Sequence, residues 1–480
     1  MEKFIFLREL EEYVSRGLTP LHMPGHKRRA EPGPGLPYSI DLTEVDGTDD
    51  LHDARGMIER AQERTAELYG AERTFYLVNG STCGILAAVR AAAGEGGEII
   101  AARNCHRSVF NAAELCALGV RWLYPPVIKD FGVFGSIRPA DVEAALTDCP
   151  AARCVIITSP TYEGVVSDIK AIAGACHARG VPLIVDEAHG AHLGLPGSGM
   201  FPAGAVECGA DAVIQSAHKT LPSLTQTAWM HLNGALISER ELRRQLDVFE
   251  TSSPSYPLMA SLDGCTGIMR EDGKELLGRW NARLEAFYAA AGELKDLRVF
   301  DGEEEGVFAF DRGKILVNGG LAGLTGAELA RLLREKYGFE TEMACGGNVL
   351  AMTSCCDADD TLTRFASALA EIDDNARGGA STASSDPPEA GKCVCSISRA
   401  LSAPAEDAEI QNAEGRTAAE YVWAYPPGVP ICVPGEVITP ENVEYISAVA
   451  ASGTPLRHSH AENGLFRVLC VDNGTVNRVN

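Results

Sequence analysis

Apolar and polar positions follow two different rhythms between about residues 57 and 250. Some segments repeat apolar residues at i, i+3 and i+4, as Ile169, Ile172 and Ala173 do, which is typical of an amphipathic helix. Short apolar runs of strand length lie between these segments. The predicted strands are Thr74–Val78, Glu98–Ala102, Val120–Tyr124, Cys154–Thr158, Pro182–Val185, Ala212–Ile214 and Gly234–Ile237. Strands that alternate with helices indicate one large α/β domain with a mainly parallel, seven-stranded sheet.

The rhythm changes after Glu250. A polar loop, Thr251–Pro257, leads into a long helical stretch that runs to about Lys295, and shorter strand and helix candidates continue to Asp374. This pattern predicts a second, smaller α+β unit.

Two Pro- and Gly-containing segments follow, and they differ in character. Residues 376–392 are rich in Gly, Ala, Ser and Pro and carry too little apolar surface to hold one shape, which predicts a linker or exposed loop. Residues 418–436 place Tyr-Pro-Pro-Gly and Val-Pro-Gly-Glu turns between apolar residues, which predicts an ordered excursion. The predicted organisation is an N-terminal segment (1–56), a large domain (57–255), a small α+β domain (256–375), a flexible linker or loop (376–413) and a C-terminal domain (414–480).

Composition narrows the classes of function. Of 480 residues, 45% are hydrophobic and 22% charged, as in globular chains long enough for two or three domains. Lys and Arg total 42 against 66 Asp and Glu, a formal charge of −24 with no basic block, so nucleic acid and anionic membranes are poor partners. Residues 1–17 have the charge pattern of an amphipathic helix rather than a signal peptide, and about 18 apolar residues never run without a charge.

The fifteen cysteines are an odd number and are scattered through apolar segments. A chain of this length needs no disulfide staples, so we expect free thiols in a reducing cytoplasm. The close pairs Cys355–Cys356 and Cys393–Cys395 have no second matched pair at finger-like spacing. We therefore expect buried or free thiols rather than zinc.

The first chemical signal is Asn79-Gly80-Ser81-Thr82, directly after one predicted strand and before an Ala-rich helix. A strand that ends in a Gly turn and a Ser/Thr-rich helix start presents backbone N–H groups and the positive helix end to an anion such as phosphate. An ordinary helix N-cap is the alternative interpretation of Ser81 and Thr82.

The second signal is Leu183-Ile184-Val185-Asp186-Glu187-Ala188-His189, a buried strand with an acid at its carboxyl end. Open parallel sheets bind their ligands at that edge. Asp-Glu-Ala-His also occurs in helicases, but that function needs an upstream Gly-Lys-Ser/Thr loop, which the sequence lacks. A metal site on His189 and His192 is a further alternative.

The third signal is Ser216-Ala217-His218-Lys219, again at a predicted strand end. An unpaired ammonium is costly in a protein interior and tends to lose its proton. The neutral amine is then a nucleophile that can form a Schiff base with an aldehyde. A solvated lysine past the strand end is the alternative.

The three motifs together indicate a binding site for one cofactor. Pyridoxal 5′-phosphate (PLP) needs donors for its phosphate, a carboxylate for its pyridine nitrogen and an amine for its aldehyde. Its flat ring also benefits from a stacked aromatic side chain, and His106 follows the predicted strand Glu98–Ala102 in a suitable place. Four strand ends thus contribute to one predicted PLP site.

These residues resemble the fold-type-I, PLP-dependent ornithine/lysine/arginine decarboxylases in their shorter bacterial form. The resemblance covers most of the chain, from Thr19-Pro-Leu-His-Met-Pro-Gly-His-Lys27, through Asp41–Asp46 and Asp49–His52, to Pro426–Glu436. It implies a fold-type-I large domain with smaller α+β C-terminal domains, and a homodimer or dimer-based assembly whose site the N-terminal segment, including His22 and His26, helps to build.

The resemblance also implies roles for single residues. Lys219 would be the Schiff-base lysine, Asp186 would pair with the pyridine nitrogen, and His106 would stack on the ring. The phosphate would be held by Ser81, Thr82, Ser216 and His218, and His189 would lie near the phenolic oxygen. Two departures stand out: Cys83 replaces an expected hydroxyl residue, and the stretch 376–413 is longer than expected.

The implied reaction is decarboxylation of a basic amino acid, arginine first, then lysine or ornithine, to agmatine, cadaverine or putrescine and CO2. His218, His106 and Lys219 are candidate proton donors. Acids that could meet the basic side chain are Glu163, Asp46, Asp50 and Glu436.

Two other functions share the cofactor. An aminotransferase uses the same lysine, aspartate and phosphate-binding residues and breaks a different bond at Cα. The residues alone therefore do not favour decarboxylation over transamination. A PLP-binding regulator would need a basic helix-turn-helix, which neither end of the chain contains.

Overall fold

The computed structural model describes residues 17–21, 44, 49–376, 378–379, 390–424, 429–451, 456–460 and 465–470. Several expectations lie outside these residues: the N-terminal helix over 1–17, the contributions of His22, His26 and Asp46, and most of the Gly- and Ser-rich stretch 376–392.

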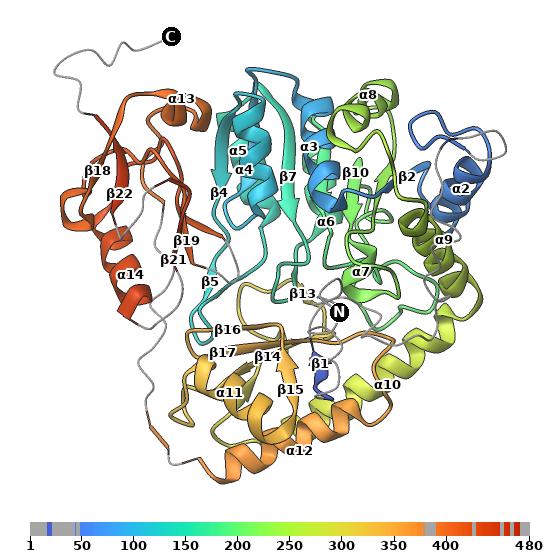
Figure 1. The fold of residues 1–480 in the computed structure, drawn as a ribbon, viewed down its shortest axis with the longest axis vertical. Helices are drawn as coiled ribbons and strands as arrows, with labels where there is room; N and C mark the ends of the chain where they lie inside the picture. The colour runs from blue at the N-terminus through green and yellow to red at the C-terminus, as the bar shows by residue number, and fades with distance from the viewer. Residues whose placement is uncertain are drawn as a thin grey trace, which may run out of the picture.

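The centre of the molecule is a seven-stranded sheet (Figure 1). Its strands, in spatial order, are β2 (Arg73–Leu77), β11 (Ala228–Leu232), β10 (Ala212–Gln215), β9 (Leu183–Asp186), β7 (Ala152–Thr158), β3 (Glu98–Ala102) and β4 (Gly119–Leu123). The strands from β10 to β4 are mutually parallel, whereas β11 is antiparallel to both of its neighbours. The predicted mainly parallel sheet is confirmed.

One strand prediction is wrong. Gly234–Ile237 is a turn rather than the seventh strand, which is β11. Gly234 has φ +65°, a left-handed conformation that turns the chain toward the next helix. The sequence pattern missed β11 because the polar residue His231 interrupts its apolar run. His231 is buried, and its ring nitrogens lie 2.8 Å from Thr74 Oγ1 and 3.0 Å from Gln215 Oε1.

Helices cover both faces of the sheet because its strands are apolar on both sides. Alternate residues of β3 show this: Ile99 and Ala101 belong to one core, and Ile100 and Ala102 belong to the other. The first core includes α3 (Gly80–Ala93), α4 (Arg107–Leu115) and α8 (Glu239–Phe249); the second includes α5 (Pro139–Asp148) and α6 (Ile169–His177). A third core joins α2 (Met57–Tyr69) to the long helices that follow the large domain.

The predicted helical stretch after residue 256 consists of two helices, α9 (Tyr256–Glu271) and α10 (Gly273–Ala291), separated at Asp272. They lead to a four-stranded antiparallel sheet covered by two helices, at the bottom of Figure 1. Its strands are β12 (Arg298–Val299), β14 (Lys314–Asn318), β17 (Asn348–Met352) and β16 (Met343–Cys345), with α11 (Gly326–Tyr337) and α12 (Thr361–Asp374) as the helices.

Short strands tie the parts together. They are β1 (Thr19–Leu21) with β15 (Phe339–Thr341), β8 (Val165–Val166) with β13 (Ala309–Phe310), and β5 (Val127–Ile128) with β6 (Val133–Phe134). The β8–β13 pair links the large domain directly to the segment before β14.

The C-terminal elements lie beside α4 and β4, at the left of Figure 1. They are α13 (Ile397–Ser402), β18 (Ala405–Ala408), a 3-10 turn (Ile410–Asn412), β19 (Val422–Ala424), β20 (Pro430–Cys432), α14 (Pro440–Ala451), β21 (Leu456–His458) and β22 (Phe466–Leu469). The range 376–413 expected as a flexible linker is therefore structured in its second half. Ile397 packs into the α3–α4 core, and β18 pairs with β22. Amino-acid composition does not reveal these long-range contacts.

None of the helices within the described ranges has the length and apolar character needed to span a membrane.

Candidate active site

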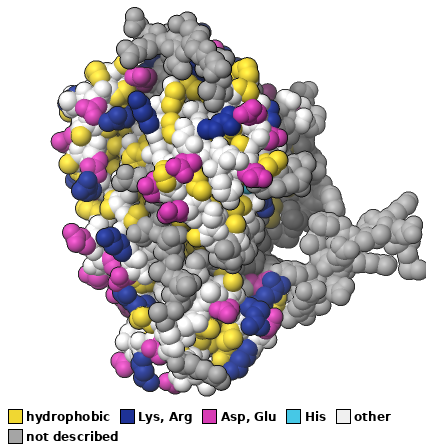
Figure 2. All heavy atoms as spheres, turned by 90° about the vertical axis from the view of Figure 1, so that its left-hand side faces the viewer, with side chains coloured by type: hydrophobic (Ala, Val, Ile, Leu, Met, Phe, Trp, Pro, Cys, Tyr) yellow, Lys and Arg dark blue, Asp and Glu magenta, His cyan; other side chains and the backbone are white. Residues whose placement is uncertain are grey.

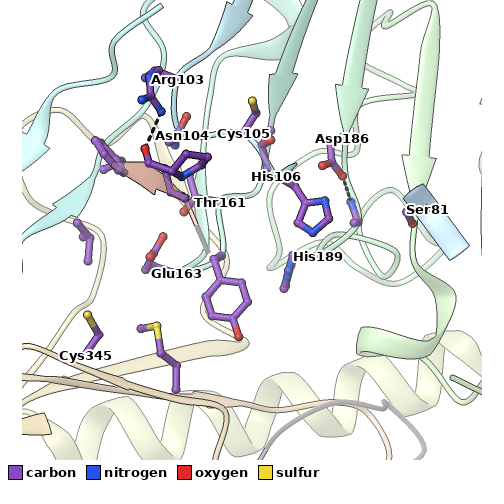
Figure 3. Close-up of a pocket in the computed structure, with 18 of the residues that line it drawn as sticks. Ser81, Arg103, Asn104, Cys105, His106, Thr161, Glu163, Asp186, His189 and Cys345 are labelled. Atoms are coloured by element: carbon purple, nitrogen blue, oxygen red, sulfur yellow. Dashed lines mark hydrogen bonds between the residues drawn. The ribbon is translucent and has the colours of Figure 1, made fainter. Parts of the chain in front are cut away.

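A cavity of about 420 Å³ lies where the carboxyl ends of the central strands face the small domain and the C-terminal elements (Figure 3). Parallel sheets place ligands at this edge because their strand ends and helix starts meet there. Each of the eight residues predicted from the sequence lines this cavity: Ser81, Thr82, His106, Asp186, His189, Ser216, His218 and Lys219. The cavity is also lined by Glu163, Cys345, Ile431 and Tyr445.

Two hydroxyl groups mark one end of the cavity. Ser81 stands in the first turn of α3, and its Oγ is 2.6 Å from the Oγ of Ser216, which precedes the short helix α7 (Ala217–Thr220). Asn79, at the N-cap of α3, makes no side-chain cap, so backbone N–H groups of the first turn are available beside these hydroxyls. An anionic group fits this arrangement.

Cys83, the expected departure, does not line the cavity. Its Sγ lies 3.1 Å from the carbonyl oxygen of Gly80, to which the thiol donates, and its side chain packs in the core beneath α3. Burial raises the pKa of this thiol well above its usual value. The substitution therefore places an inert thiol where a hydroxyl was expected.

Asp186 ends β9 in the middle of the sheet, in register with Thr158 of β7 and Ile214 of β10. Its carboxylate Oδ1 accepts the backbone N–H of Ala188 at 3.2 Å. Burial raises the pKa of Asp186, and the nearby Lys219 amine opposes that rise. A cationic partner in the cavity would stabilise the ionised carboxylate.

Lys219 lies one turn after β10, and its Nζ is 3.0 Å from Nε2 of His189. Burial of the amine lowers the pKa of Lys219, while the carboxylates of Asp186 and Glu342 act in the opposite direction. The amine therefore has an increased neutral, nucleophilic fraction.

His106 forms the N-cap of α4, and its Nδ1 accepts the backbone N–H of Ser108 at 3.3 Å. The neutral ring consequently carries its proton on Nε2. Although the ring is solvent-accessible across the open cavity, crowding by protein atoms lowers the pKa of His106 to about 4, with Lys219 and Arg107 adding to the effect. Figure 3 shows this ring in the same part of the cavity as Asp186 and His189.

Another predicted histidine, His218, is oriented by the backbone. Its Nδ1 lies 2.9 Å from the carbonyl oxygen of Thr227. A carbonyl only accepts, so the neutral ring carries its proton on Nδ1 and Nε2 is the acceptor nitrogen.

Of the four acids expected to meet a basic side chain, Glu163 lines the cavity. Burial raises the pKa of Glu163. Glu436 instead pairs with Arg103 at 3.1 Å, Asp50 Oδ1 accepts the backbone N–H of His52 at 2.9 Å, and Asp46 lies outside the described residues.

The histidine pair proposed as an alternative metal site is divided between two environments. His192 is fully buried beside Phe201 and Trp280, 3.2 Å from Asp311 Oδ1, whereas His189 faces the cavity. Within the described residues, no group of three or more His, Cys, Asp or Glu side chains is arranged to hold a metal ion.

Sequence reasoning missed the residues that reach the site from other domains. Lys314 at the start of β14 contacts His189, and Glu342 of the small domain accepts at its Oε1 from the OH of the lining residue Tyr162 at 2.7 Å. Tyr445 of α14 lines the cavity. A lysine that opens the apolar run Lys314-Ile-Leu-Val was the one available signal.

Comparison with known proteins gives consistent matches. A family model described as Orn/Lys/Arg decarboxylase, major domain, matches residues 5–303, and one described as Orn/Lys/Arg decarboxylase, C-terminal domain, matches residues 383–456. Arginine decarboxylase of Bacillus subtilis (strain 168) is 31% identical over 469 residues, covering 93% of this chain and 94% of that protein. Arginine decarboxylase of Halalkalibacterium halodurans is 32% identical over 463 residues, covering 94% of each. The solved structure of lysine decarboxylase A from Pseudomonas aeruginosa has a TM-score of 0.73 at 18% identity, covering 97% of this chain and 82% of that chain.

Proposed function

Because the chain belongs to the Orn/Lys/Arg decarboxylase family, it is an amino-acid decarboxylase, and we propose that its substrate is arginine and its cofactor PLP. The family resemblance and the fold-type-I architecture expected from the sequence are thereby confirmed. The observation that carries the proposal is the meeting of Lys219, Asp186 and the Ser81–Ser216 hydroxyl pair around one cavity.

The residues present fit PLP. Ser81, Thr82 and Ser216 supply hydroxyl donors beside the start of α3 for the phosphate, Asp186 supplies a carboxylate for the pyridine nitrogen, and Lys219 supplies the amine for the aldehyde. The solvent-accessible ring of His106 offers a flat face for stacking. A buried carboxylate whose pKa is raised by desolvation gains most from such a cationic ring partner.

When bound, PLP accepts the electron pair that departing CO2 leaves on Cα. In this proposal the protein residues orient the cofactor and stabilise its charges. Asp186 remains ionised to keep a proton on the ring nitrogen, and the Ser81–Ser216 end anchors the phosphate. The cavity walls, together with the proposed second subunit, would exclude water around the bond that breaks.

Proton delivery to Cα is assigned from the tautomers. His106 carries a proton on Nε2, while the neutral ring of His218 holds its proton on Nδ1 against the Thr227 carbonyl. His106 and the Lys219 amine are therefore the better placed proton donors, whereas a neutral His218 with its proton on Nδ1 has none on Nε2 to deliver.

The arginine side chain is proposed to meet Glu163. Asp186 and Glu163 are the acids among the described lining residues, and Asp186 is committed to the cofactor. Figure 3 shows Glu163 on the side of the cavity near Thr161 and Cys345, away from Asp186. A carboxylate there can take a guanidinium through charge-assisted hydrogen bonds.

A homodimer is part of the proposal. Thr82, His106 and Tyr124 line the cavity and are nevertheless exposed in the single chain. A second subunit would cover them and exclude water from the site. We also propose a cytoplasmic location, because all fifteen cysteines are free thiols.

The test is an assay of the purified protein with PLP and, separately, arginine, lysine and ornithine. The proposal expects CO2 release with agmatine from arginine at a kcat/KM at least about tenfold above the other two substrates. Release of cadaverine or putrescine at the higher kcat/KM would reassign the substrate. Formation of a keto acid that depends on an added amino acceptor would contradict decarboxylation.

A further inference from the structure

A buried lysine of the small domain reaches the site through His189. Lys314, at the start of β14, is 1% exposed, and its Nζ lies 2.6 Å from Nδ1 of His189. The other ring nitrogen, Nε2, lies 3.0 Å from Nζ of Lys219. One imidazole thus bridges two amines that come from different domains.

The Lys314 side chain is held in place by packing. Gly164 has φ +107°, and a Cβ on it would lie 2.8 Å from both Cβ and Cγ of Lys314. The carbonyl of Gly164 also accepts the N–H of Asp311 at 2.8 Å, which fixes the turn just before Lys314. The aliphatic part of the Lys314 side chain therefore packs against Gly164, where any larger residue would clash with it.

Proton counting limits this bridge to two arrangements. A neutral imidazole carries one N–H and one acceptor nitrogen. Burial, reinforced by the two amines, holds the pKa of His189 well below its ordinary value, so the ring is neutral. Either Lys314 donates to Nδ1 and Nε2–H donates to Lys219, or both directions are reversed.

The surrounding charges favour the first arrangement. Asp311 and Glu163 face Lys314; burial would raise the pKa of Asp311, but His192 and Lys314 bring it below its ordinary value, so Asp311 is ionised. Asp186 and Glu342 face Lys219, and burial raises the pKa of Asp186. His106 and His218 also face His189, and crowding by protein atoms lowers the pKa of His106 to about 4, so that ring is neutral near pH 7. The acid whose pKa is lowered thus lies on the Lys314 side, where it favours the charged form of that amine.

We propose that Lys314 is a positioning residue that donates to Nδ1 of His189 and thereby aims the Nε2–H of His189 at the Lys219 amine. A donor on that side can bind only the lone pair of a neutral Lys219. Lys314 therefore prepares Lys219 as a nucleophile without touching it. The inference rests on the proposed function only in taking Lys219 as the amine that reacts with PLP.

The first test reads the tautomer directly in the full-length, cofactor-free protein. Long-range 1H–15N spectra of protein with 15N-labelled histidine report which ring nitrogen carries the proton, and the His189 signals are identified by their loss in His189→Asn. The expected result is a proton on Nε2 of His189. A proton on Nδ1 or a doubly protonated ring overturns the proposal.

The second test measures the reactivity of Lys219. Trace acetylation with acetic anhydride, quantified by peptide mass spectrometry from about pH 6 to about pH 10, gives the pH at which Lys219 becomes neutral. Lys314→Met removes the donor and a positive charge, so this midpoint should rise by about one pH unit. Lys314→Arg, which keeps a charged donor, should restore it to within about 0.3 unit.

Lys295→Met is the matched control, because Lys295 belongs to the same domain and its amine is exposed beside Asp374. This variant should leave the Lys219 midpoint unchanged. An unchanged midpoint in a folded Lys314→Met variant, checked by circular dichroism, overturns the proposal. Neither test measures decarboxylation. A failed decarboxylase assay, which would contradict the proposed function, can therefore be distinguished from a failure of this inference.

Discussion

Desolvation shifts the pKa values of three charged groups in the cavity, those of Asp186, Glu163 and Lys219. Desolvation raises the pKa of the two carboxyls and lowers the pKa of the amine, so each charged form needs a partner from within the cavity. The cofactor ring and the substrate side chain are the cationic partners that the proposed function supplies. The roles of individual residues follow from which of these partners they meet.

Glu163→Gln should raise the KM for arginine about 10-fold to 100-fold and change kcat less than about threefold, since it removes a charge-assisted contact to a part of the substrate that does not react. Only ionised Glu163 attracts the cation, and its pKa is raised, so in the unmodified enzyme KM should fall as pH rises through that raised value. Steady-state kinetics against pH test this. An unaffected KM, equal to that of the exposed control Glu305→Gln, would contradict the assignment.

His106→Phe should keep the cofactor affinity within about threefold, and His106→Ala should weaken it about tenfold, because only phenylalanine preserves a stacking ring. Both variants lose the N-cap of α4 equally. With its pKa lowered to about 4, His106 stays neutral above about pH 5. The pH profile of kcat for His106→Phe between about pH 6 and 8 should therefore keep the shape of the unmodified enzyme's profile at a lower kcat, and loss of a titration step there would exclude this account of His106.

Strands and helices of the large domain were predictable because their apolar runs are local. The motifs after β2, β3, β9 and β10 follow their strands directly, so parallel pairing brings them to one edge. His231 inside β11 broke that pattern, and Ile397 of α13 stands in a polar stretch. Lys314 escaped prediction because its contact with His189 depends on the docking of two domains, 125 residues apart in sequence.

One buried ion pair joins the C-terminal elements to the end of β3. Arg103, just past β3, donates to Glu436 Oε2 at 3.1 Å and to the Pro430 carbonyl at 2.8 Å. Val429, Pro430 and Ile431 form part of the cavity wall. This ion pair therefore positions a wall of the active site.

Glu436→Gln should lower the free energy of unfolding by about 3 kcal/mol, since it leaves the Arg103 charge buried without a full partner. Asp407→Asn, which breaks an exposed pair with Arg467, should cost less than about 1 kcal/mol. Urea denaturation measures both, and hydrogen exchange at residues 430–432 should increase in the first variant alone. Equal effects of the two substitutions would show that the buried pair does not hold the wall.

The molecule brings three parts of the chain around one cavity. Figure 2 shows acidic and basic side chains interspersed on the face it presents, without a continuous basic patch. The net charge of −24 is consistent with a small cationic substrate and disfavours nucleic acid. Thr82 and His106 are exposed within the cavity, and the proposed second subunit would cover them.

Size-exclusion chromatography with light scattering should therefore give twice the chain mass of 51.0 kDa, or a multiple of that dimer, at concentrations where the enzyme is active. Dilution that separates the subunits should reduce activity in parallel, because water then enters the site. A fully active monomer would contradict the dimeric site.

Covalent attachment of PLP to Lys219 is the most direct test of the whole account. The protein is supplied with PLP, reduced with borohydride, digested and mapped by mass spectrometry. The account predicts one pyridoxyl group, on Lys219, and none on Lys314 or in Lys219→Ala. Labelling of another lysine, or an unlabelled Lys219 in protein that decarboxylates arginine, would contradict it.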